Sequence, residues 1–376
     1  MSDLSLQLQQ ATSQFPVSSY FSEALFQREL ETIFAKGPRY VGHAAAVPHV
    51  GDYYALPQEN EGRALVHTPN GIQLISNVCR HRQAVMLKGR GTLPQGNNIV
   101  CPLHRWTYNN QGELLGAPQF DTTPCMNLQK FRLRDCHGLL FEGPRDPAAD
   151  MAPLFARPEF DFGDYVLDHV EVHQCNYNWK TFIEVYLEDY HVGPFHPGLG
   201  NFVTCDDLAW EFKPEYSVQT VGIANQLQKP GSPVYQKWHE VLMQYRNGEL
   251  PEQGAIWLTY YPHIMVEWYP NVLTVSTLHP LGVDKTLNLV EFFYPEEIAA
   301  FEPEFIEAQK AAYMETCIED DEIAERMDAG RKALLERGDN EVGPYQSPME
   351  DGMQHFHAWY RRKVGHPEEL AVDALR

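Results

Sequence analysis

Two short segments each place one cysteine and one histidine close together. Cys79 and His81 stand in NVCRHR, Cys101 and His104 stand in CPLHRWTY, and 19 residues separate His81 from Cys101. Two thiolates and two neutral imidazoles could hold a tetrahedral Zn²⁺, or a [2Fe–2S] cluster in which the cysteines bind one iron and the histidines the other. A common zinc finger groups its cysteines in one pair and its histidines in another. Here each segment supplies one of each, which favours a cluster held between two hairpin tips.

A second group of possible metal ligands lies in the segment NYNWKTFIEVYLEDYHVGPFHP. A helix is expected from about Trp179 to His191, with Glu188 and His191 on one face. Because His196 lies about 140° further around a straight helix, both imidazoles reach one metal only if the helix breaks, and Gly193-Pro194 predicts that break. With a carboxylate from elsewhere, the two histidines would form a facial triad that leaves positions for O₂ beside a substrate on Fe(II). For this segment alone, structural histidines at a helix end are the alternative.

The residues around the first group resemble the Rieske domain of ring-hydroxylating oxygenases, which carries C-x-H, then C-P-x-H followed by W-x-Y and a Gly. Arg105 departs from the pattern, because the family usually has Gly there, and predicts a more crowded or more positive loop. Respiratory-chain Rieske proteins carry an extra cysteine in each loop, where this chain has Ala84 and Leu103, so the oxygenase branch is favoured. The matching residues are Cys79, His81, Cys101, Pro102, His104, Trp106, Tyr108 and Gly112.

The second group is similar to the catalytic motif of the same oxygenases, with Val185 in place of the usual Asn. The resemblance implies a third ligand, an Asp on a late helix in a pattern like E-D-x-x-I-x-E, which EDDEIAE at residues 319–325 matches. Asp320 is therefore the predicted ligand and Asp321 the alternate. Tyr313, Cys317, Asp320, Ala324 and Met327 form one helical stripe in which Asp320 is the single charge. The residues matching the motif are Asn178, Trp179, Lys180, Glu184, Glu188, Tyr190, His191 and His196.

Glu188 has a different implied role. In the family, the acid three residues before the first histidine links that histidine to a cluster-binding histidine of a neighbouring subunit. The resemblance therefore implies that electrons pass from His104 through Glu188 to His191 of another chain, and that the subunits form a ring, commonly a homotrimer. Many members have Asp here, and Glu is similar to a subset acting on quaternary ammonium compounds.

The order of the expected elements predicts an α+β chain. A helical lead-in is expected over residues 1–39. Short β-like runs such as ALVHT, IQLIS and GLLFEG predict an all-β domain over residues 40–145, and a stretch rich in Pro and Asp, 146–165, is the expected linker. Longer runs such as IMVEWY and TLNLVEFFY, with a charged helix from about Pro303 to Arg337, predict an antiparallel sheet with helices over residues 166–376. The resemblance extends from about Tyr40 to Tyr360 and implies a Rieske domain joined to a helix-grip catalytic domain.

Composition excludes several classes of protein. The 29 basic and 51 acidic residues give a formal net charge of −22, which argues against nucleic-acid or anionic-membrane partners. Seven cysteines at irregular spacing are unlike a secreted disulfide framework. The first residues do not resemble a signal peptide, and no stretch of about 18 apolar residues suggests a membrane span. A cytoplasmic protein is expected.

The segment 79–105 contains five basic and no acidic residues, although the whole chain is acidic. This basic collar could steer an acidic electron donor to the cluster, and a solvated loop surface is the alternative. No G-x-G-x-x-G follows a strand, so NAD(P)H is expected to bind a separate reductase. The collar consists of Arg80, Arg82, Lys88, Arg90 and Arg105.

Together these features predict a terminal oxygenase that takes electrons from a reductase or ferredoxin and uses O₂ to hydroxylate a small organic substrate, aromatic or quaternary ammonium. Monooxygenation, dioxygenation and demethylation all stay open. A Rieske ferredoxin-like carrier with an appended binding domain, or a zinc-stabilised module, is the alternative from another class. Packing is expected for His355, His357, Trp359 and Tyr360. Core packing is also favoured for four candidate pocket aromatics, which are Phe202, Trp210, Tyr260 and Trp268.

Overall fold

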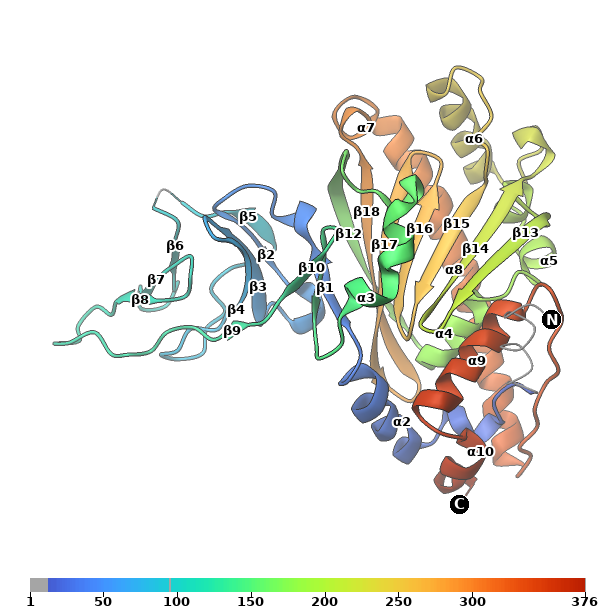
Figure 1. Cartoon of the computed structure of the whole chain (residues 1–376), viewed down its shortest axis with the longest axis horizontal. Coiled ribbons are helices and arrows are strands. Elements are labelled where there is room, and N and C mark those ends of the chain that lie inside the picture. The colour runs from blue at the N-terminus through green and yellow to red at the C-terminus, as the bar shows by residue number, and fades with distance from the viewer. Residues whose placement is uncertain (1–12, 95, 376) are drawn as a thin grey trace. The chain divides into compact units, whose positions relative to one another are not determined.

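A computed structural model of the chain describes residues 13–94 and 96–375, which fall into two compact units (Figure 1). Residues 36–156 form the small unit, and the described residues before 36 and after 156 form the large unit. The division falls inside the predicted linker 146–165. Of the expected lead-in helix, the part before residue 13 lies outside the described residues. The remainder contains helix α2 (Glu23–Glu29), followed by a π-helical turn at Leu30–Phe34.

The small unit is built from antiparallel strands in three sheets, with strand orders β5-β2-β3-β4-β9, β6-β7-β8 and β1-β11-β10. The loop between β4 and β5 carries Cys79 and His81, and the loop between β6 and β7 carries Cys101 and His104. This organisation confirms the predicted all-β domain. The elements are β1 (Arg39–His43), β2 (Asp52–Ala55), β3 (Arg63–Thr68), β4 (Gly71–Ser76), β5 (Arg90–Thr92), β6 (Asn98–Val100), β7 (Thr107–Asn109), β8 (Leu114–Gly116), β9 (Lys130–Phe131), β10 (Arg134–Cys136), β11 (Leu139–Glu142) and α3 (Pro147–Met151).

The large unit contains one antiparallel sheet of seven strands in the order β12-β18-β17-β16-β15-β14-β13. Strand β16 lies at its centre, and its pairing with β15 and β17 sets Glu267 beside Trp257 and Thr274. The predicted antiparallel sheet is confirmed. Its strands are β12 (Tyr165–Cys175), β13 (Val203–Lys213), β14 (Tyr216–Ile223), β15 (Ala255–Tyr260), β16 (Ile264–Tyr269), β17 (Val272–Gly282) and β18 (Lys285–Pro295).

Helices cover the sheet face that carries Trp257 and Phe292, and apolar side chains of α6 and α8 complete the core there. Figure 1 shows α8 as a long rod crossing this sheet. It runs from Pro303 to Glu336 and confirms the predicted charged helix. The other helices of the unit are α4 (Trp179–Tyr186), α5 (Val192–Phe195), α6 (Pro233–Tyr245), α7 (Glu296–Phe301), α9 (Asp351–Lys363) and α10 (Pro367–Leu370).

The helix predicted from Trp179 to His191 is shorter than expected. Helix α4 ends at Tyr186, and a turn precedes the short helix α5. Gly193-Pro194 lies inside α5, so the prediction that the break occurs there is wrong. Backbone hydrogen bonds from other segments replace helical ones in this turn. The N–H of Met353 donates to the carbonyl of Leu187 at 3.1 Å, and the N–H of Asp189 donates to the carbonyl of Met349 at 3.0 Å.

Buried polar groups fix α4 against α8. Asp328 on α8 accepts from the N–H of Asn178 at 2.8 Å and from the Thr181 hydroxyl at 2.6 Å, both at the start of α4. One turn further along each helix, Arg331 donates to Glu184 at 2.7 Å. Burial alone raises the pKa of Glu184, but the charge of Arg331 and the hydrogen bonds from His357 and Tyr20 together outweigh it and lower the pKa to about 2. The start of α4 therefore cannot shift along α8 without leaving buried charges unpaired.

A second buried network ties α2 to α4 and α9. Glu29 accepts from Lys180 Nζ at 2.7 Å, from Trp179 Nε1 at 2.8 Å and from the Tyr360 hydroxyl at 2.5 Å. Neither charged side chain is more than 1% exposed. Because the partners are remote in sequence, this carboxylate joins the N-terminal helix to the rest of the large unit.

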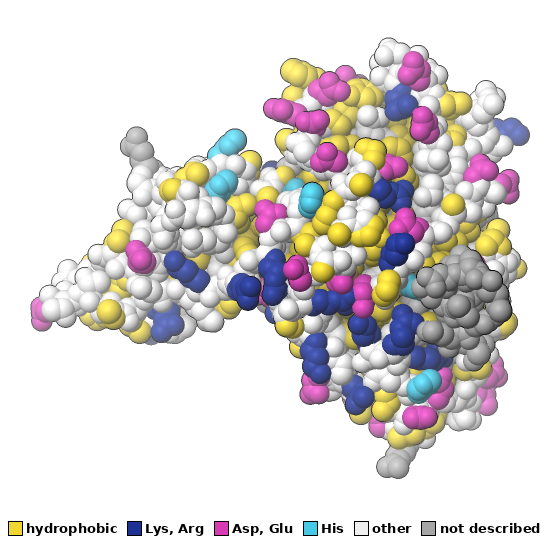
Figure 2. Space-filling model, in the orientation of Figure 1, with side chains coloured by type: hydrophobic (Ala, Val, Ile, Leu, Met, Phe, Trp, Pro, Cys, Tyr) yellow, Lys and Arg dark blue, Asp and Glu magenta, His cyan; other side chains and the backbone are white. Residues whose placement is uncertain are grey.

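Charge on the surface is unevenly distributed. On the face that Figure 2 shows, acidic side chains are most frequent toward the top and the rim of the large unit, and basic ones are most frequent across its lower centre, with some acidic ones among them. Among the described residues, no helix has the length and apolar character needed to cross a membrane.

Replacing Glu29 with Gln is expected to destabilise the large unit by about 3 kcal/mol, because the Lys180 ammonium keeps its burial but loses its counter-charge. The matched control is Glu304→Gln, which removes a carboxylate from an exposed pair with Lys237 and should cost less than about 0.5 kcal/mol. Urea unfolding followed by tryptophan fluorescence measures both. Equal unfolding midpoints for the two variants would contradict the role given to Glu29.

Candidate metal centres

The first cysteine loop is a closed turn from Cys79 to Ala84. The N–H of Cys79 donates to the carbonyl of Ala84 at 2.9 Å, and the N–H of Gln83 donates back to the carbonyl of Cys79 at 3.1 Å. Gln83 closes the turn with a φ of +55°. His81 therefore lies on a tight loop whose ends are fixed by backbone hydrogen bonds.

The second loop repeats this arrangement from Cys101 to Trp106. The N–H of Cys101 donates to the carbonyl of Trp106 at 2.8 Å, and the N–H of Arg105 donates to the carbonyl of Cys101 at 3.1 Å. Arg105 has a φ of +61°, in the left-handed region that costs a residue with a Cβ about 1 kcal/mol. This backbone explains why Gly suits the position. The left-handed backbone at Arg105 therefore strains the loop. Because the Arg105 side chain is exposed, it makes the loop more positive without crowding it.

The two loops bring the four predicted cluster ligands together. The rings of His81 and His104 lie 4.7 Å apart between centroids, and Trp106 stacks on His81 at 5.0 Å. The Tyr108 hydroxyl lies 3.6 Å from Cys79 Sγ. Among the described residues, His81 Nδ1 is buried without a hydrogen-bond partner, which is rare for a nitrogen that has no other ligand. Two sulfurs and two imidazoles in this arrangement fit a [2Fe–2S] cluster.

The second centre is formed where α4 and α5 meet α8. The turn after α4 carries Glu188 and His191, and His196 follows α5 directly. Glu188 Oε1 accepts from His191 Nδ1 at 2.6 Å, and Glu319 Oε2 accepts from His196 Nδ1 at 2.7 Å. Each imidazole therefore has its Nδ1 held by a carboxylate, which leaves Nε2 available to a metal.

Asp320 completes the group. Its Oδ1 lies 3.0 Å from Nε2 of His196 and 3.4 Å from Nε2 of His191. Burial alone would lower the pKa of His191, but the hydrogen bonds that its ring donates to Asp320 and Glu188, with the charges of these two acids, outweigh it and raise the pKa to about 10. The carboxylates thus create a negative potential at the two Nε2 atoms, which suits a divalent cation. Two imidazoles and one carboxylate on one side of the site fit mononuclear iron with open positions.

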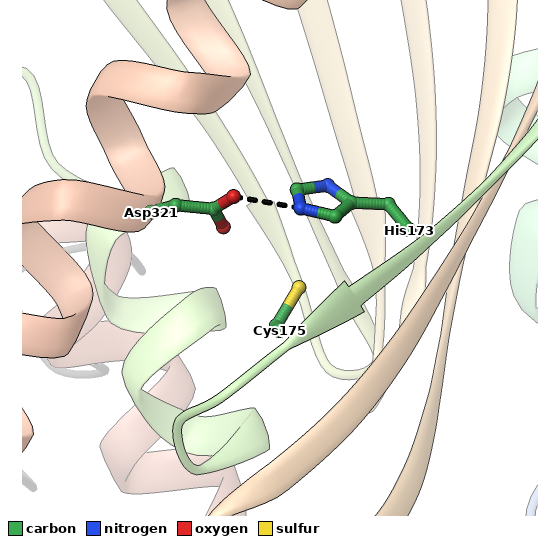
Figure 3. A group of neighbouring side chains, drawn as sticks. All are labelled: His173, Cys175 and Asp321. Carbon is green, nitrogen blue, oxygen red and sulfur yellow. Dashed lines mark ion pairs between the residues drawn. The ribbon is translucent and has the colours of Figure 1, made fainter.

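Asp321, the alternate ligand, points elsewhere. Its Oδ2 lies 2.7 Å from Nε2 of His173, and its Oδ1 accepts from the Tyr177 hydroxyl at 2.7 Å. Figure 3 shows Asp321 facing His173, with Cys175 beside them. Burial raises the pKa of the Cys175 thiol to about 12, so it remains a neutral thiol. The Asp321–His173 pair holds α8 to the edge strand β12, and Asp320 is left facing His191 and His196.

A cavity of about 100 Å³ lies beside this group, walled mainly by aromatic rings. Of the four candidate pocket aromatics, Phe202 lines it, whereas Trp210, Tyr260 and Trp268 do not. Side chains alternate between the faces of a strand. Trp257 and Tyr269, on the same strands as Tyr260 and Trp268, face the cavity in their place.

Two further acids at this site were missed from sequence. The EDDEIAE pattern assigns no role to Glu319, although its position directly before Asp320 is a usable signal. Glu267 lines the cavity from the middle of an otherwise apolar strand, and a lone acid in such a run was the available sign.

The HFHAWY segment packs as predicted. His355 Nδ1 lies 2.9 Å from the Tyr261 hydroxyl, and His357 Nε2 lies 2.9 Å from Glu184 Oε1. Trp359 and Tyr360 are buried beside them in the core formed by α2, α4 and α9.

Comparisons with known proteins agree with both centres. Residues 38–131 match the family model of the Rieske [2Fe-2S] domain, and residues 162–366 match that of the ring hydroxylating alpha subunit (catalytic domain). Putrescine 2-hydroxylase of Bordetella bronchiseptica is 70% identical, over 96% of this chain and 86% of that protein. Putrescine 2-hydroxylase of Ralstonia nicotianae is 66% identical, over 96% of this chain and 99% of that protein. A solved quaternary ammonium Rieske monooxygenase superposes with a TM-score of 0.74 at 20% identity, covering 94% of this chain and 96% of that one.

The chain belongs to the family of ring-hydroxylating oxygenase alpha subunits. It is a Rieske non-haem iron oxygenase that takes electrons through a [2Fe–2S] cluster and uses O₂ at a mononuclear iron to hydroxylate a small substrate. The alternative of a non-catalytic carrier is not favoured, because the catalytic domain is matched along with the cluster domain.

The two neighbouring acids on α8 give a direct test of the metal ligands. Asp320→Ala is expected to keep the visible absorption of the cluster while iron content falls from about three to about two per chain. Asp321→Ala, the matched control, should keep about three irons and lose thermal stability instead. Equal loss of iron in the two variants would show that Asp320 is not the specific ligand.

Proposed function

We propose that this oxygenase hydroxylates an aliphatic diamine, putrescine, at the carbon next to an amine-bearing carbon. Relatives that match almost the whole chain at 70% and 66% identity carry the name putrescine 2-hydroxylase. The proposal replaces the aromatic or quaternary ammonium substrate expected from the family resemblance.

The charge of the cavity is the observation that carries this proposal. Of the described residues lining it, none is Lys or Arg, while Asp189 and Glu267 add two buried carboxylates beyond the acids at the metal group. Buried carboxylates without a cationic partner are costly. A doubly charged ammonium substrate would compensate them, and the aromatic walls favour cations as well.

The reaction balances as a monooxygenation. One oxygen atom enters a C–H bond to give an alcohol, and the other leaves as water, using two electrons from the reductase and two protons. Bound iron supplies the place where O₂ is reduced beside the substrate. His191, His196 and Asp320 would hold that iron, Glu188 and Glu319 orient the imidazoles, and the aromatic walls exclude water from the reacting carbon.

Electrons are proposed to travel between subunits in a ring of three. Glu188 holds His191 Nδ1 with one carboxylate oxygen and the backbone N–H of His191 with the other, and 18% of its side chain stays exposed. His104 is exposed at the tip of its loop. Glu188 would therefore accept a hydrogen bond from His104 of the partner subunit and join the two centres.

The electron donor is proposed to be an acidic reductase or ferredoxin that draws on NAD(P)H. All five residues of the basic collar are exposed beside the cluster loops, as docking of such a partner requires. The reaction is expected in the cytoplasm, because none of the seven cysteines forms a disulfide within the described chain.

Turnover with putrescine tests the function. The purified oxygenase, supplied with a reductase, NAD(P)H and isotopically labelled O₂, is expected to convert putrescine into an amino alcohol that carries one labelled oxygen on carbon 2. Mass spectrometry with fragment analysis identifies the position. NAD(P)H consumption without any hydroxylated diamine, or oxidation of carnitine instead, would contradict the proposal.

Glu188 and Glu319 form a matched pair, because each holds the Nδ1 of one metal-binding histidine. If Glu188 also carries the electron path, Glu188→Gln should slow oxidation of the reduced cluster in a single turnover by about 100-fold or more, whereas Glu319→Gln should slow it far less. Both variants are expected to keep the cluster and the iron. A Glu188→Gln enzyme with both metals and full turnover would rule out the bridge.

A further inference from the structure

Glu267 is a buried carboxylate in the middle of the central strand β16. It is 2% exposed and lines the cavity. The side chains on either side, Val266 and Trp268, do not line the cavity. Glu267 has no ion-pair partner among the described residues, and no described lining residue is Lys or Arg. This differs from the buried acids Glu29 and Glu184, which are paired with Lys180 and Arg331.

The hydrogen bonds around Glu267 leave room for a ligand. The Tyr269 hydroxyl donates to Oε2 at 3.0 Å and the Tyr313 hydroxyl donates to Oε1 at 3.1 Å. The Tyr269 oxygen also accepts from Trp257 Nε1 at 3.1 Å, which directs its proton toward Glu267. Each carboxylate oxygen thus accepts one neutral hydrogen bond, and the Thr274 hydroxyl, paired opposite Glu267 on β17, is a third neutral donor. A carboxylate has about four acceptor positions, so about one remains for a charged donor.

A second polar atom in the same cavity has no partner. The Tyr186 hydroxyl is buried and forms no hydrogen bond with any described residue. Burial raises the pKa of Glu267 to about 7, as expected for an acid that lacks a counter-charge. A buried hydroxyl and a buried carboxylate without a cation, both on one cavity, together indicate a polar, positively charged ligand.

The distance from Glu267 to the metal group suits a short chain. Tyr313, which donates to Glu267, precedes Asp320 by two turns of α8, about 10 Å along the helix axis. Aromatic rings line part of this interval, since Tyr269 and Tyr313 both line the cavity and meet edge to face at 6.3 Å. Glu267, through Tyr313, and the metal group, through Asp320, thus contact α8 about two helical turns apart, and the part of the cavity between them forms a slot.

We infer that Glu267, framed by the Tyr269 and Tyr313 hydroxyls, binds the ammonium group of the substrate at the end remote from the hydroxylated carbon. The inference rests on the proposed function and assigns the residue that sets its substrate class. The ammonium pairs with the carboxylate, the Tyr186 hydroxyl accepts a further N–H, and the ring faces of Tyr269 and Tyr313 stabilise the charge. The alkyl chain then extends along the slot, and the distance to the carboxylate selects the carbon that reaches the metal group.

Asp189 is the other buried acid of the cavity and is less suited to this role. Its Oδ1 accepts from Gln219, while its Oδ2 is buried without a hydrogen-bond partner among the described residues. Its backbone N–H is tied to Met349, and it lies two residues from His191. Asp189 therefore belongs to the turn that carries the metal ligands, not to the end remote from them.

The experiment compares Glu267→Gln with the holoenzyme. The amide keeps the shape but lacks the charge. Its oxygen can accept from one tyrosine hydroxyl, while its NH2 group can only donate, so the other tyrosine must turn its hydroxyl proton away. Equilibrium binding by calorimetry and steady-state kinetics are measured with putrescine, 1-aminobutane, 1-butanol and 1,4-butanediol. The control is Glu171→Gln on β12, outside the cavity lining, which removes the carboxylate of a half-exposed ion pair with Lys310.

In the wild-type enzyme, amines are expected to bind more tightly than the matching alcohols. Glu267→Gln should raise the Kd and KM for both amines by about 100-fold, and leave the alcohols and the iron content unchanged. Glu267→Asp should give intermediate values, and Glu171→Gln wild-type ones. If Glu267→Gln fails to retain its metals, the site is tested instead by the Kd and KM values of Glu267→Asp and by whether the wild-type enzyme binds amines more tightly than alcohols.

The outcomes separate the two proposals. If putrescine is not hydroxylated, but 1-aminobutane binds more tightly than 1-butanol and loses that preference in Glu267→Gln, the proposed function fails and the ammonium site stands. If putrescine is hydroxylated and its KM is unchanged in Glu267→Gln, the function stands and the ammonium site is wrong. Equal wild-type binding of amines and alcohols also overturns the site.

Discussion

The contact of Asp328 with the start of α4 is the interaction on which the iron group depends. One carboxylate binds the N–H of Asn178 and the hydroxyl of Thr181, so two segments about 150 residues apart are held in one register. His191 and His196 follow α4, and Asp320 lies eight residues before Asp328 on α8. A shift of either helix would separate the imidazoles from the carboxylate. The metal group is therefore positioned mainly by a polar contact buried outside the cavity.

The ligands themselves could be predicted from sequence because their signals are local. Each cluster loop is a short turn closed by its own backbone hydrogen bonds, so the Cys and His that are close in sequence are also close in space. The end of α4 could not be predicted, because carbonyls and N–H groups near Leu187 and Asp189 bind Met353 and Met349, far along the chain. Helix propensity contains no information about such partners.

Adjacent acids mark a second limit of sequence reasoning. Asp320 and Asp321 are neighbours of the same type, and only the position of His173 and Tyr177 on one side of α8 decides which of them faces the histidines. The same holds for strands β15 and β16, where the choice between Tyr260 and Trp257, or between Trp268 and Glu267, depends on which face the helices cover. Periodicity predicted the strands but not which side of each one faces the cavity.

Helix α8 has a consequence for how substrate range can change in this family of enzymes. Asp320 lies near the middle of this helix, while Gln309, Ala312 and Tyr313 line the cavity two turns and more toward its start. Because one continuous helix carries both Asp320 and Tyr313, the helix and not a loop sets the distance between the metal group and the ammonium site. Substitutions near the start of the helix can then change the length or charge of the substrate that fits, while the metal ligands stay the same.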